Sequence, residues 1–292
     1  MREFGAGDSL AAKRIFRIVL NDPAASRGII RGRLGYTAKG QPVNAWYFPG
    51  TSDERALIIG GMHGSELSSI ALAEELIAAL QEGERPSYSV VIVPRLFPDN
   101  AAEAIGQPKQ LGSFQNIGRY SCKGATDPNR QMPSPGRAFD PSTGLDHMGR
   151  RIERENQFLL QLIQDFRPSR IANLHAIRDE SKGGIYADPR TDHFGIALGF
   201  ESDSTLAIEM ALAALEAGGS MKGNGLPERY NTLYYKDPAA VAAGQWQPRN
   251  FIGSFGKQLR GAGVSMGTWG STAIALERQS RTQSPSNARD HG

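Results

Sequence analysis

The sequence predicts an α/β fold, in which helices cover both faces of a β-sheet. Two short apolar runs, at residues 56–59 and 90–93, have the composition of strands that are buried on both faces. Two longer segments, at residues 68–80 and 150–166, repeat their apolar residues at helical spacing. Strand and helix segments alternate along the chain, and this alternation is typical of α/β folds.

The first half of the chain supplies three strands and a helix. Val43–Phe48 is predicted as a strand because it follows the turn signal in the sequence AKGQP. Ala56–Ile59 is the second strand, and the helix Ser68–Leu80 comes after it with one apolar stripe. The third strand is Ser89–Val93, which ends at Pro94.

The second half of the chain is more irregular. Phe97–Gly149 is rich in Gly, Pro, Asn and Asp and is predicted as one long loop, a kind of segment that is often functional. A helix at Arg150–Phe166 and a strand at Arg170–Leu174 follow it. A third helix is expected at Thr205–Ala217, and a last short strand at Thr272–Leu276.

We predict one folded domain at residues 13–278, with flexible tails at residues 1–12 and 279–292. The second tail contains no large apolar residue. A chain of 292 residues buries enough surface to fold without covalent links. Its single cysteine, Cys122, excludes an intramolecular disulfide and any metal site built from several cysteines, and it favours a reducing compartment.

Charge and hydropathy exclude several classes of protein. The 33 basic and 30 acidic residues leave a formal net charge of +3, which is too small for a basic face that binds nucleic acid. No apolar run reaches the length of about 18 residues that a transmembrane helix requires. The N-terminal segment lacks the apolar stretch of a secretory signal. We therefore expect a cytoplasmic protein that binds neither nucleic acid nor membrane.

Three potential metal ligands follow predicted strands. His63 and Glu66 lie in the sequence HGSE after the strand Ala56–Ile59, and their three-residue offset lets an imidazole and a carboxylate reach one cation. His175 directly follows the strand Arg170–Leu174. Open α/β sheets bind ligands at the carboxyl ends of their strands. Two histidines and one glutamate form a catalytic zinc ligand set that leaves one coordination position open, so we predict one Zn²⁺ per chain.

Further residues could complete a hydrolytic site. Glu277 ends the last predicted strand and is the candidate general base. Arg130 can form bidentate bonds to a substrate carboxylate, and the amide of Asn129 beside it can donate a hydrogen bond. Taken singly, each of these residues has an ordinary structural explanation, and the prediction depends on their conjunction. The other histidines lack this context and are interpreted as surface or loop residues: His147, His193 and His291.

Five segments, in this order, resemble the motifs of the zinc carboxypeptidase family. GGMHGSE at residues 60–66 resembles the G-x-H-G-x-E zinc motif, and VPRLFPDN at residues 93–100 resembles the NPDG segment. DPNRQMP at residues 127–133 resembles D-x-N-R-x-x-P, NLHA resembles the segment of the third ligand, and ALER resembles the strand of the catalytic glutamate. The resemblance covers residues 35–277 and is nearest to the bacterial murein-peptide amidases.

This resemblance implies a mixed, mostly parallel, twisted eight-stranded sheet with helices on both faces. It also implies that His63, Glu66 and His175 bind zinc, that Asn129 and Arg130 hold the terminal carboxylate of the substrate, and that Glu277 is the general base. The implied activity is that of a metallocarboxypeptidase or amidase, which hydrolyses a peptide or amide bond next to the C-terminal residue of a small peptide. A murein-derived peptide is one candidate substrate.

The sequence departs from the family pattern at two places. FPDN stands where NPDG is usual, and Gln131–Met132 stand where Asn–Phe is usual. Arg119 is a candidate for an additional arginine that polarises the scissile carbonyl. The tyrosine that covers the substrate stays open among Tyr230, Tyr234 and Tyr235. The residue that selects the substrate side chain is expected within Gly253–Thr268, where the candidates are Ser254, Lys257, Arg260 and Ser265.

Two other functions remain open. The first is an N-acyl amino acid amidohydrolase of the aspartoacylase or succinylglutamate desuccinylase type, which shares the H-x-x-E and N-R motifs. Such proteins usually carry a β-rich domain after the catalytic glutamate, and this chain ends shortly after Glu277. The second is a carboxypeptidase-fold binding module without activity. The oligomeric state is not predicted.

Overall fold

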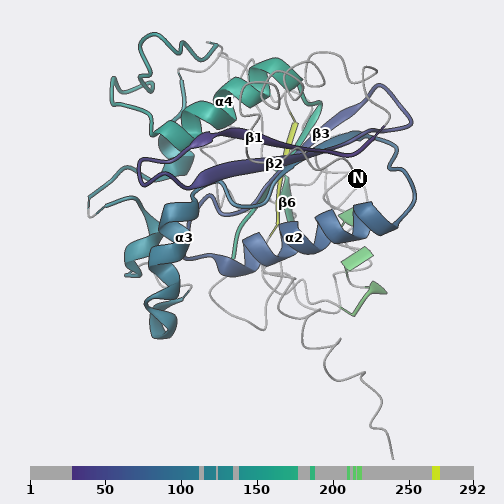
Figure 1. Ribbon diagram of the computed structural model, residues 1–292, viewed down its shortest axis with the longest axis horizontal. Helices are drawn as coiled ribbons and strands as arrows, with labels where there is room; N and C mark the ends of the chain where they lie inside the picture. Colours follow the sequence, from purple (N-terminus) through teal and green to yellow (C-terminus); the bar gives the residue numbers. More distant parts are fainter. Residues whose placement is uncertain are drawn as a thin grey trace, which may run out of the picture.

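The computed structural model describes residues 28–111, 115–122, 124–133, 138–176, 185–187, 209–210, 213–214, 216–218 and 265–269 (Figure 1). The strands in this part of the chain are β1 (Ile30–Tyr36), β2 (Pro42–Phe48), β3 (Arg55–Ile59), β4 (Ser89–Val93), β5 (Arg170–Leu174), β6 (Ile185–Ala187) and β7 (Ser265–Trp269). The helices are α2 (Leu67–Glu82), α3 (Pro98–Ile105) and α4 (Arg154–Phe166), with short 3₁₀ helices η2 (Pro108–Gln110), η3 (Ile117–Arg119) and η4 (Pro128–Arg130).

The strands form one mixed sheet in the order β1-β2-β4-β3-β5-β7-β6. The four central strands, β4, β3, β5 and β7, run parallel to one another. The pairings of β1 with β2, of β2 with β4 and of β6 with β7 are antiparallel. The prediction of a mixed sheet is therefore confirmed, but parallel pairing is restricted to its centre. The described residues contain seven strands rather than the eight that the family resemblance implies.

Helices α4 and α2 pack against opposite faces of this sheet (Figure 1). Successive side chains of a strand point to opposite faces, and β4 illustrates the division. Val91 and Val93 belong to one apolar cluster with Phe166 and the other buried residues of α4. Val90 and Ile92 belong to a second cluster, which contains Ala73 and Ile77 of α2. The apolar run at residues 90–93 of β4 is thus explained by a helix on each face of the sheet.

Most of the predicted elements are found, with small shifts at their ends. The predicted strands in the first two hundred residues correspond to β2, β3, β4 and β5, and the first two predicted helices correspond to α2 and α4. Helix α4 begins at Arg154 rather than at Arg150. The third predicted helix, Thr205–Ala217, is described only in part. Its described residues before Ala217 are helical, namely residues 209, 210, 213, 214 and 216. Strands β1, β6 and β7 were not predicted.

The prediction that Phe97–Gly149 is one long loop is wrong at its start. Helix α3 begins at Pro98, where the missing N–H of a proline costs no hydrogen bond, and Asp99 lies in its first turn. Ala101 and Ala104 bury one side of the helix. The departure from the family pattern in FPDN is therefore accommodated as the beginning of a helix.

Several predictions fall outside the described residues. These are the strand Thr272–Leu276 with Glu277 at its end, the two tails, the three candidate tyrosines, and the candidates Ser254, Lys257 and Arg260. Ser265 is described as the first residue of β7. Within the described part of the chain, no helix combines the length and the apolar character that crossing a membrane would require.

Candidate metal centre

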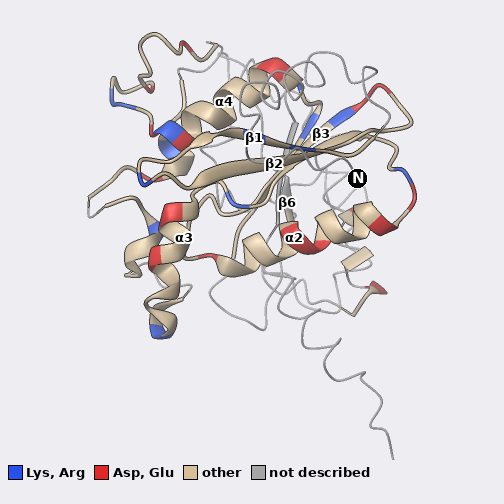
Figure 2. Ribbon diagram, viewed as in Figure 1, with Lys and Arg blue, Asp and Glu red and all other residues tan. Residues whose placement is uncertain are grey.

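Charged residues of both signs lie on the described helices and loops, whereas β2 and β4 carry none (Figure 2). Against this background, several charged and titratable side chains are buried close together. His63 and Glu66 are each only 4% exposed, and Arg119 is 8% exposed. Buried groups of this kind are costly unless they compensate one another. We therefore expect these side chains to compensate one another's charge.

A tight turn at the carboxyl end of β3 carries His63 and Glu66. Gly61 begins the turn with a φ of +67°, in the left-handed region that favours glycine. Gly64 lies against the start of α3, so close that a Cβ atom there would come within 2.4 Å of the carbonyl carbon of Asn100. Glu66 is the residue that precedes the first turn of α2. Gly61 and Gly64 of the GGMHGSE segment thus allow the chain to turn from the sheet into a helix at very close range.

His175 reaches the same point from the neighbouring strand. β5 pairs with β3 in parallel, with Ile59 opposite Asn173, and both strands end within two residues of this pair. Parallel neighbours present their carboxyl ends at the same edge of a sheet. The residues that follow the two strands are consequently brought together, although Glu66 and His175 are 109 positions apart in the sequence.

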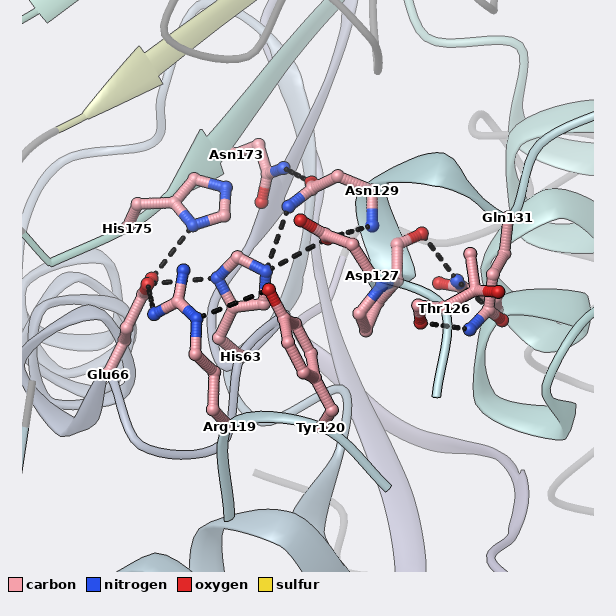
Figure 3. Close-up of polar contacts among 12 residues, drawn as sticks. His63, Glu66, Arg119, Tyr120, Thr126, Asp127, Asn129, Gln131, Asn173 and His175 are labelled. Carbon is pink, nitrogen blue, oxygen red and sulfur yellow. Dashed lines mark hydrogen bonds and ion pairs between the residues drawn. The ribbon is translucent and has the colours of Figure 1, made fainter. Parts of the chain in front are cut away.

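The Glu66 carboxylate lies between the two imidazoles (Figure 3). Its Oε1 is 2.9 Å from Nδ1 of His63, and its Oε2 is 2.8 Å from Nδ1 of His175. One ligand atom from each of these three residues lies within 4.8 Å of the other two. The structure thus brings together the three residues that the sequence predicted as zinc ligands.

The donor set fits a zinc ion. Two imidazole nitrogens and a carboxylate face one point, and this combination is a known catalytic zinc set with room for a fourth ligand. The far nitrogen of His63, Nε2, lies 3.1 Å from Oδ1 of Asp127. A carboxylate on the outer nitrogen of a ligating histidine fixes its tautomer and its ring orientation. Asp127 therefore supports His63 from the side that faces away from the three candidate ligand atoms.

Asp127 is a site residue that the sequence reasoning missed. Its Oδ1 also accepts a hydrogen bond of 2.8 Å from the backbone N–H of Asn129, and it thereby caps the short helix η4. Burial alone would raise the pKa of Asp127, but the hydrogen bond and the charge of His63 lower it to about 2. The first position of the D-P-N-R segment was the signal that could have identified this residue, because an aspartate before proline commonly caps a turn.

Arg119 donates a hydrogen bond of 2.9 Å from a terminal guanidinium nitrogen to Oε1 of Glu66. Burial alone would raise the pKa of Glu66, but His63 and His175 hold it well below its usual value. Burial disfavours the charged form of His63, yet Glu66 and Asp127 outweigh this effect and raise its pKa to about 9. The buried charges thus stabilise one another.

Asn129, which the sequence analysis named as a candidate binding residue, lies beside the cluster. It is 2% exposed, and its Nδ2 lies 3.2 Å from Nε2 of His63. Arg130 follows it on η4 and is partly exposed. Tyr120, which the sequence analysis did not identify, packs its ring edge to face with His63 at a centroid distance of 5.7 Å. No local sequence pattern pointed to this tyrosine.

The second departure from the family pattern, Gln131–Met132, holds the η4 segment in place. Gln131 donates a hydrogen bond of 2.9 Å to the carbonyl of Thr126 and accepts one of 2.9 Å from the N–H of Glu153. Met132 is fully buried in the main apolar cluster. Asn156 of α4 donates a 2.8 Å hydrogen bond to the carbonyl of Pro128. The turn that carries Asn129 and Arg130 is therefore fastened to α4 and to the core.

We expect Gly64→Ala to lower stability and weaken metal binding. The added Cβ would meet backbone atoms of α3, so the turn must shift, and overpacking of this kind typically costs about 1–3 kcal/mol. Thermal unfolding and zinc titration measure both effects. Gly28→Ala is the matched control, because a Cβ there meets no atom within 4 Å. Equal stability and equal zinc affinity in Gly64→Ala and wild-type protein would contradict this account of the turn.

Metal affinity should rise with pH up to about pH 9. A metal must displace the proton of His63, whose pKa in the metal-free protein is about 9, whereas Glu66 carries no proton in this range. The loss of one proton implies a gain of up to about tenfold in affinity per pH unit. Competition titrations at several pH values measure the slope.

The control for this pH dependence is Asp127→Asn, which removes one of the groups that raise the pKa of His63. The rise of zinc affinity with pH should therefore end at a lower pH in this variant than in the wild-type protein. Calorimetry in buffers of different ionisation enthalpy counts the protons released. A zinc affinity that is the same at pH 6 and pH 8 in the wild-type protein would refute the assignment of His63 as a ligand.

No protein-family model matches the chain, and no curated protein sequence matches it. Solved structures do match. A candidate carboxypeptidase A from Shewanella denitrificans superposes with a TM-score of 0.52 at 12% identity, over 88% of this chain and 59% of that protein. A candidate metallopeptidase from Shewanella amazonensis gives 0.50 at 16% identity, over 94% and 95% of the two chains.

A candidate carboxypeptidase from Burkholderia mallei also matches, with a TM-score of 0.50 at 14% identity, over 85% of this chain and 61% of that protein. This chain thus spans about three fifths of the S. denitrificans and B. mallei proteins and nearly all of the S. amazonensis protein. At these identities the likeness concerns the fold, which is carboxypeptidase A-like.

Proposed function

We propose that this chain, which has a carboxypeptidase A-like fold, is a zinc-dependent hydrolase that cleaves a peptide or amide bond next to the C-terminal residue of a small peptide. The observation that carries this proposal is the convergence of His63, Glu66 and His175 at one edge of the sheet, with Asn129 buried beside them. A purely structural core gains little from such a cluster, because buried ion pairs rarely stabilise a fold on balance.

His63, Glu66 and His175 would hold one Zn²⁺ per chain. When bound, the ion supplies a Lewis acid that polarises a carbonyl group and lowers the pKa of water toward neutrality. Glu66 is a carboxylate at physiological pH, because its pKa lies well below the usual value. Asp127 orients the ring of His63 through Nε2, so that Nδ1 faces Glu66. These contacts keep the three donors in one arrangement.

Asn129 and Arg130 are proposed to bind the free carboxylate of the residue that is released. The amide nitrogen of Asn129 is a donor beside the cluster, and Arg130 follows on the same rigid turn. A guanidinium can hold a carboxylate through two parallel hydrogen bonds. Binding of the terminal carboxylate would fix the register of the peptide, so that its last amide bond lies at the metal centre.

Arg119 is proposed to stabilise negative charge that develops on the scissile carbonyl oxygen. Its guanidinium lies within 2.9 Å of Glu66 and is nearly buried, so it is a fixed cation at the metal centre. Preorganised positive charge of this kind commonly makes a large contribution to catalysis. Glu277 remains the proposed general base, which accepts the proton of the attacking water and returns it to the leaving amine.

The proposed substrate is a small peptide with a free carboxylate, and a murein-derived peptide is one member of this class. Side-chain selection is proposed to depend on residues within Gly253–Thr268. An N-acyl amino acid amidohydrolase and an inactive binding module are the two outcomes that the experiments must distinguish from the proposal.

A paired assay on the purified, zinc-loaded protein tests the proposal. We expect one zinc per chain, hydrolysis of short peptides with a free C-terminus, and weaker hydrolysis of the same peptides as C-terminal amides. A chelator should abolish the activity and added Zn²⁺ should restore it. Hydrolysis of acetyl-aspartate or succinyl-glutamate alone would favour the amidohydrolase, and bound zinc without any hydrolysis would favour the binding module.

Glu277→Gln should keep zinc and lose most of the turnover. General acid–base catalysis is typically worth about 10²–10⁴, and we expect a loss of roughly three orders of magnitude in kcat. Metal analysis and steady-state kinetics provide the two measurements. Near wild-type turnover in the variant with zinc bound would reject Glu277 as the base.

Arg130→Lys should weaken the binding of substrates that have a free carboxylate. Lysine keeps the charge but loses the planar fork, so kcat/KM should fall about 10- to 100-fold, mainly through KM. The C-terminal amide of the same peptide is the control substrate, and its kcat/KM should change much less. Equal losses for the acid and the amide would show that Arg130 does not bind the carboxylate.

A further inference from the structure

We propose that Asn173 is a positioning residue that sets the orientation of the Asn129 amide, so that the donor end of Asn129 faces the substrate carboxylate. This inference rests on the proposed function, because it assigns a task to the site that binds the carboxylate. Asn173 was not identified as a site residue from the sequence. It lies on β5, two residues before His175, and is fully buried.

The contact that carries the inference is a hydrogen bond of 3.0 Å from Nδ2 of Asn173 to Oδ1 of Asn129 (Figure 3). The backbone of Asn173 is held on both sides, because β5 pairs with β3 and with β7, opposite Ile59 and Thr268. Asn129 is 2% exposed. Two buried amides in contact therefore fix each other's rotation about the last side-chain bond.

An asparagine amide has a donor end and an acceptor end that point in opposite directions. Because Oδ1 of Asn129 accepts from Asn173, its Nδ2 is turned away from Asn173 and toward the outer side of His63, where it lies 3.2 Å from Nε2. Only this donor end can bind a carboxylate. In the opposite orientation, Oδ1 would face the substrate carboxylate and repel it.

The amide nitrogen of Asn129 and the carboxylate of Asp127 both lie within hydrogen-bond distance of Nε2 of His63. Nδ1 of His63 faces Glu66, and Nε2 lies 3.1 Å from the carboxylate of Asp127, to which it donates when it carries a proton. A ring nitrogen that donates to Asp127 has no lone pair for the amide of Asn129. When Nε2 carries the proton, the donor of Asn129 therefore has no acceptor on His63, and a carboxylate oxygen of the substrate can supply one.

Asn173→Asp replaces the hydrogen-bond donor that residue 173 presents to Asn129 with an acceptor. The aspartate has the same shape but only accepts, so Nδ2 of Asn129 would turn toward it and Oδ1 would turn toward the substrate. We expect KM for a peptide with a free carboxylate to rise about tenfold or more, with a smaller effect on kcat. Asn173→Leu offers neither a donor nor an acceptor, so its effect on KM should be intermediate. KM for the matching peptide amide should stay within about twofold of wild type in both variants.

Direct repulsion by the new charge at residue 173 is separated by a double-mutant cycle. If Asn173 acts through Asn129, then Asn173→Asp adds no further loss in a protein that already carries Asn129→Ala. An equal rise in KM with and without Asn129 would overturn the inference. Zinc content and thermal stability of each variant are measured first. Zinc content should stay at the wild-type value, because Asn173 touches none of the three ligands in the contacts described. Thermal stability should fall, because each variant changes a hydrogen bond between two buried amides.

Hydrogen exchange of the side-chain amide protons, followed by ¹⁵N NMR on the zinc-loaded protein, tests the orientation without any substrate. In the wild-type protein the protons of Asn173 should be protected and those of Asn129 should exchange faster. In Asn173→Asp the protons of Asn129 should become protected. Unchanged exchange of Asn129 would refute the inference, whereas equal hydrolysis of acid and amide peptides by wild-type protein would refute the proposed function alone.

Discussion

Parallel pairing of β3 with β5 is the constraint on which the candidate site depends. His63 and Glu66 follow β3, His175 follows β5, and the register that sets Ile59 opposite Asn173 brings the three side chains to one edge of the sheet. The helices that cover the two faces keep these strands buried, so the register is fixed by packing on both sides. Two segments that are distant in sequence thus form one cluster because of the sheet alone.

The charges of the cluster depend on one another as strongly as they depend on the fold. Glu66 is in contact with His63, His175 and Arg119, and Asp127 compensates the outer nitrogen of His63. Removal of Glu66 would take a buried carboxylate contact from His63, His175 and Arg119 at once, which is far more costly than the loss of a surface ion pair. A cluster of this kind contributes little net stability, and its chemistry explains its presence better than its packing does.

The sequence predicted those features that depend on local pattern. The apolar runs of β3 and β4, the stripes of α2 and α4, and the positions of the three candidate ligands after their strands are of this kind. Helix α3 was missed because its Pro, Asp and Asn residues resemble a loop, although they begin a helix. The contacts of Asp127 and Asn173 were not predicted, because their partners lie 64 and 44 positions away and neither residue directly follows a predicted strand.

X-ray absorption spectroscopy at the zinc edge, on the purified protein loaded with one equivalent of Zn²⁺, tests the central claim most directly. The account predicts two imidazole nitrogens and at least one carboxylate oxygen at about 2.0–2.2 Å, with no sulfur ligand. In His175→Ala the spectrum should lose one imidazole. A zinc spectrum with sulfur or without imidazole, or one that His175→Ala leaves unchanged, would contradict the assignment of the metal centre.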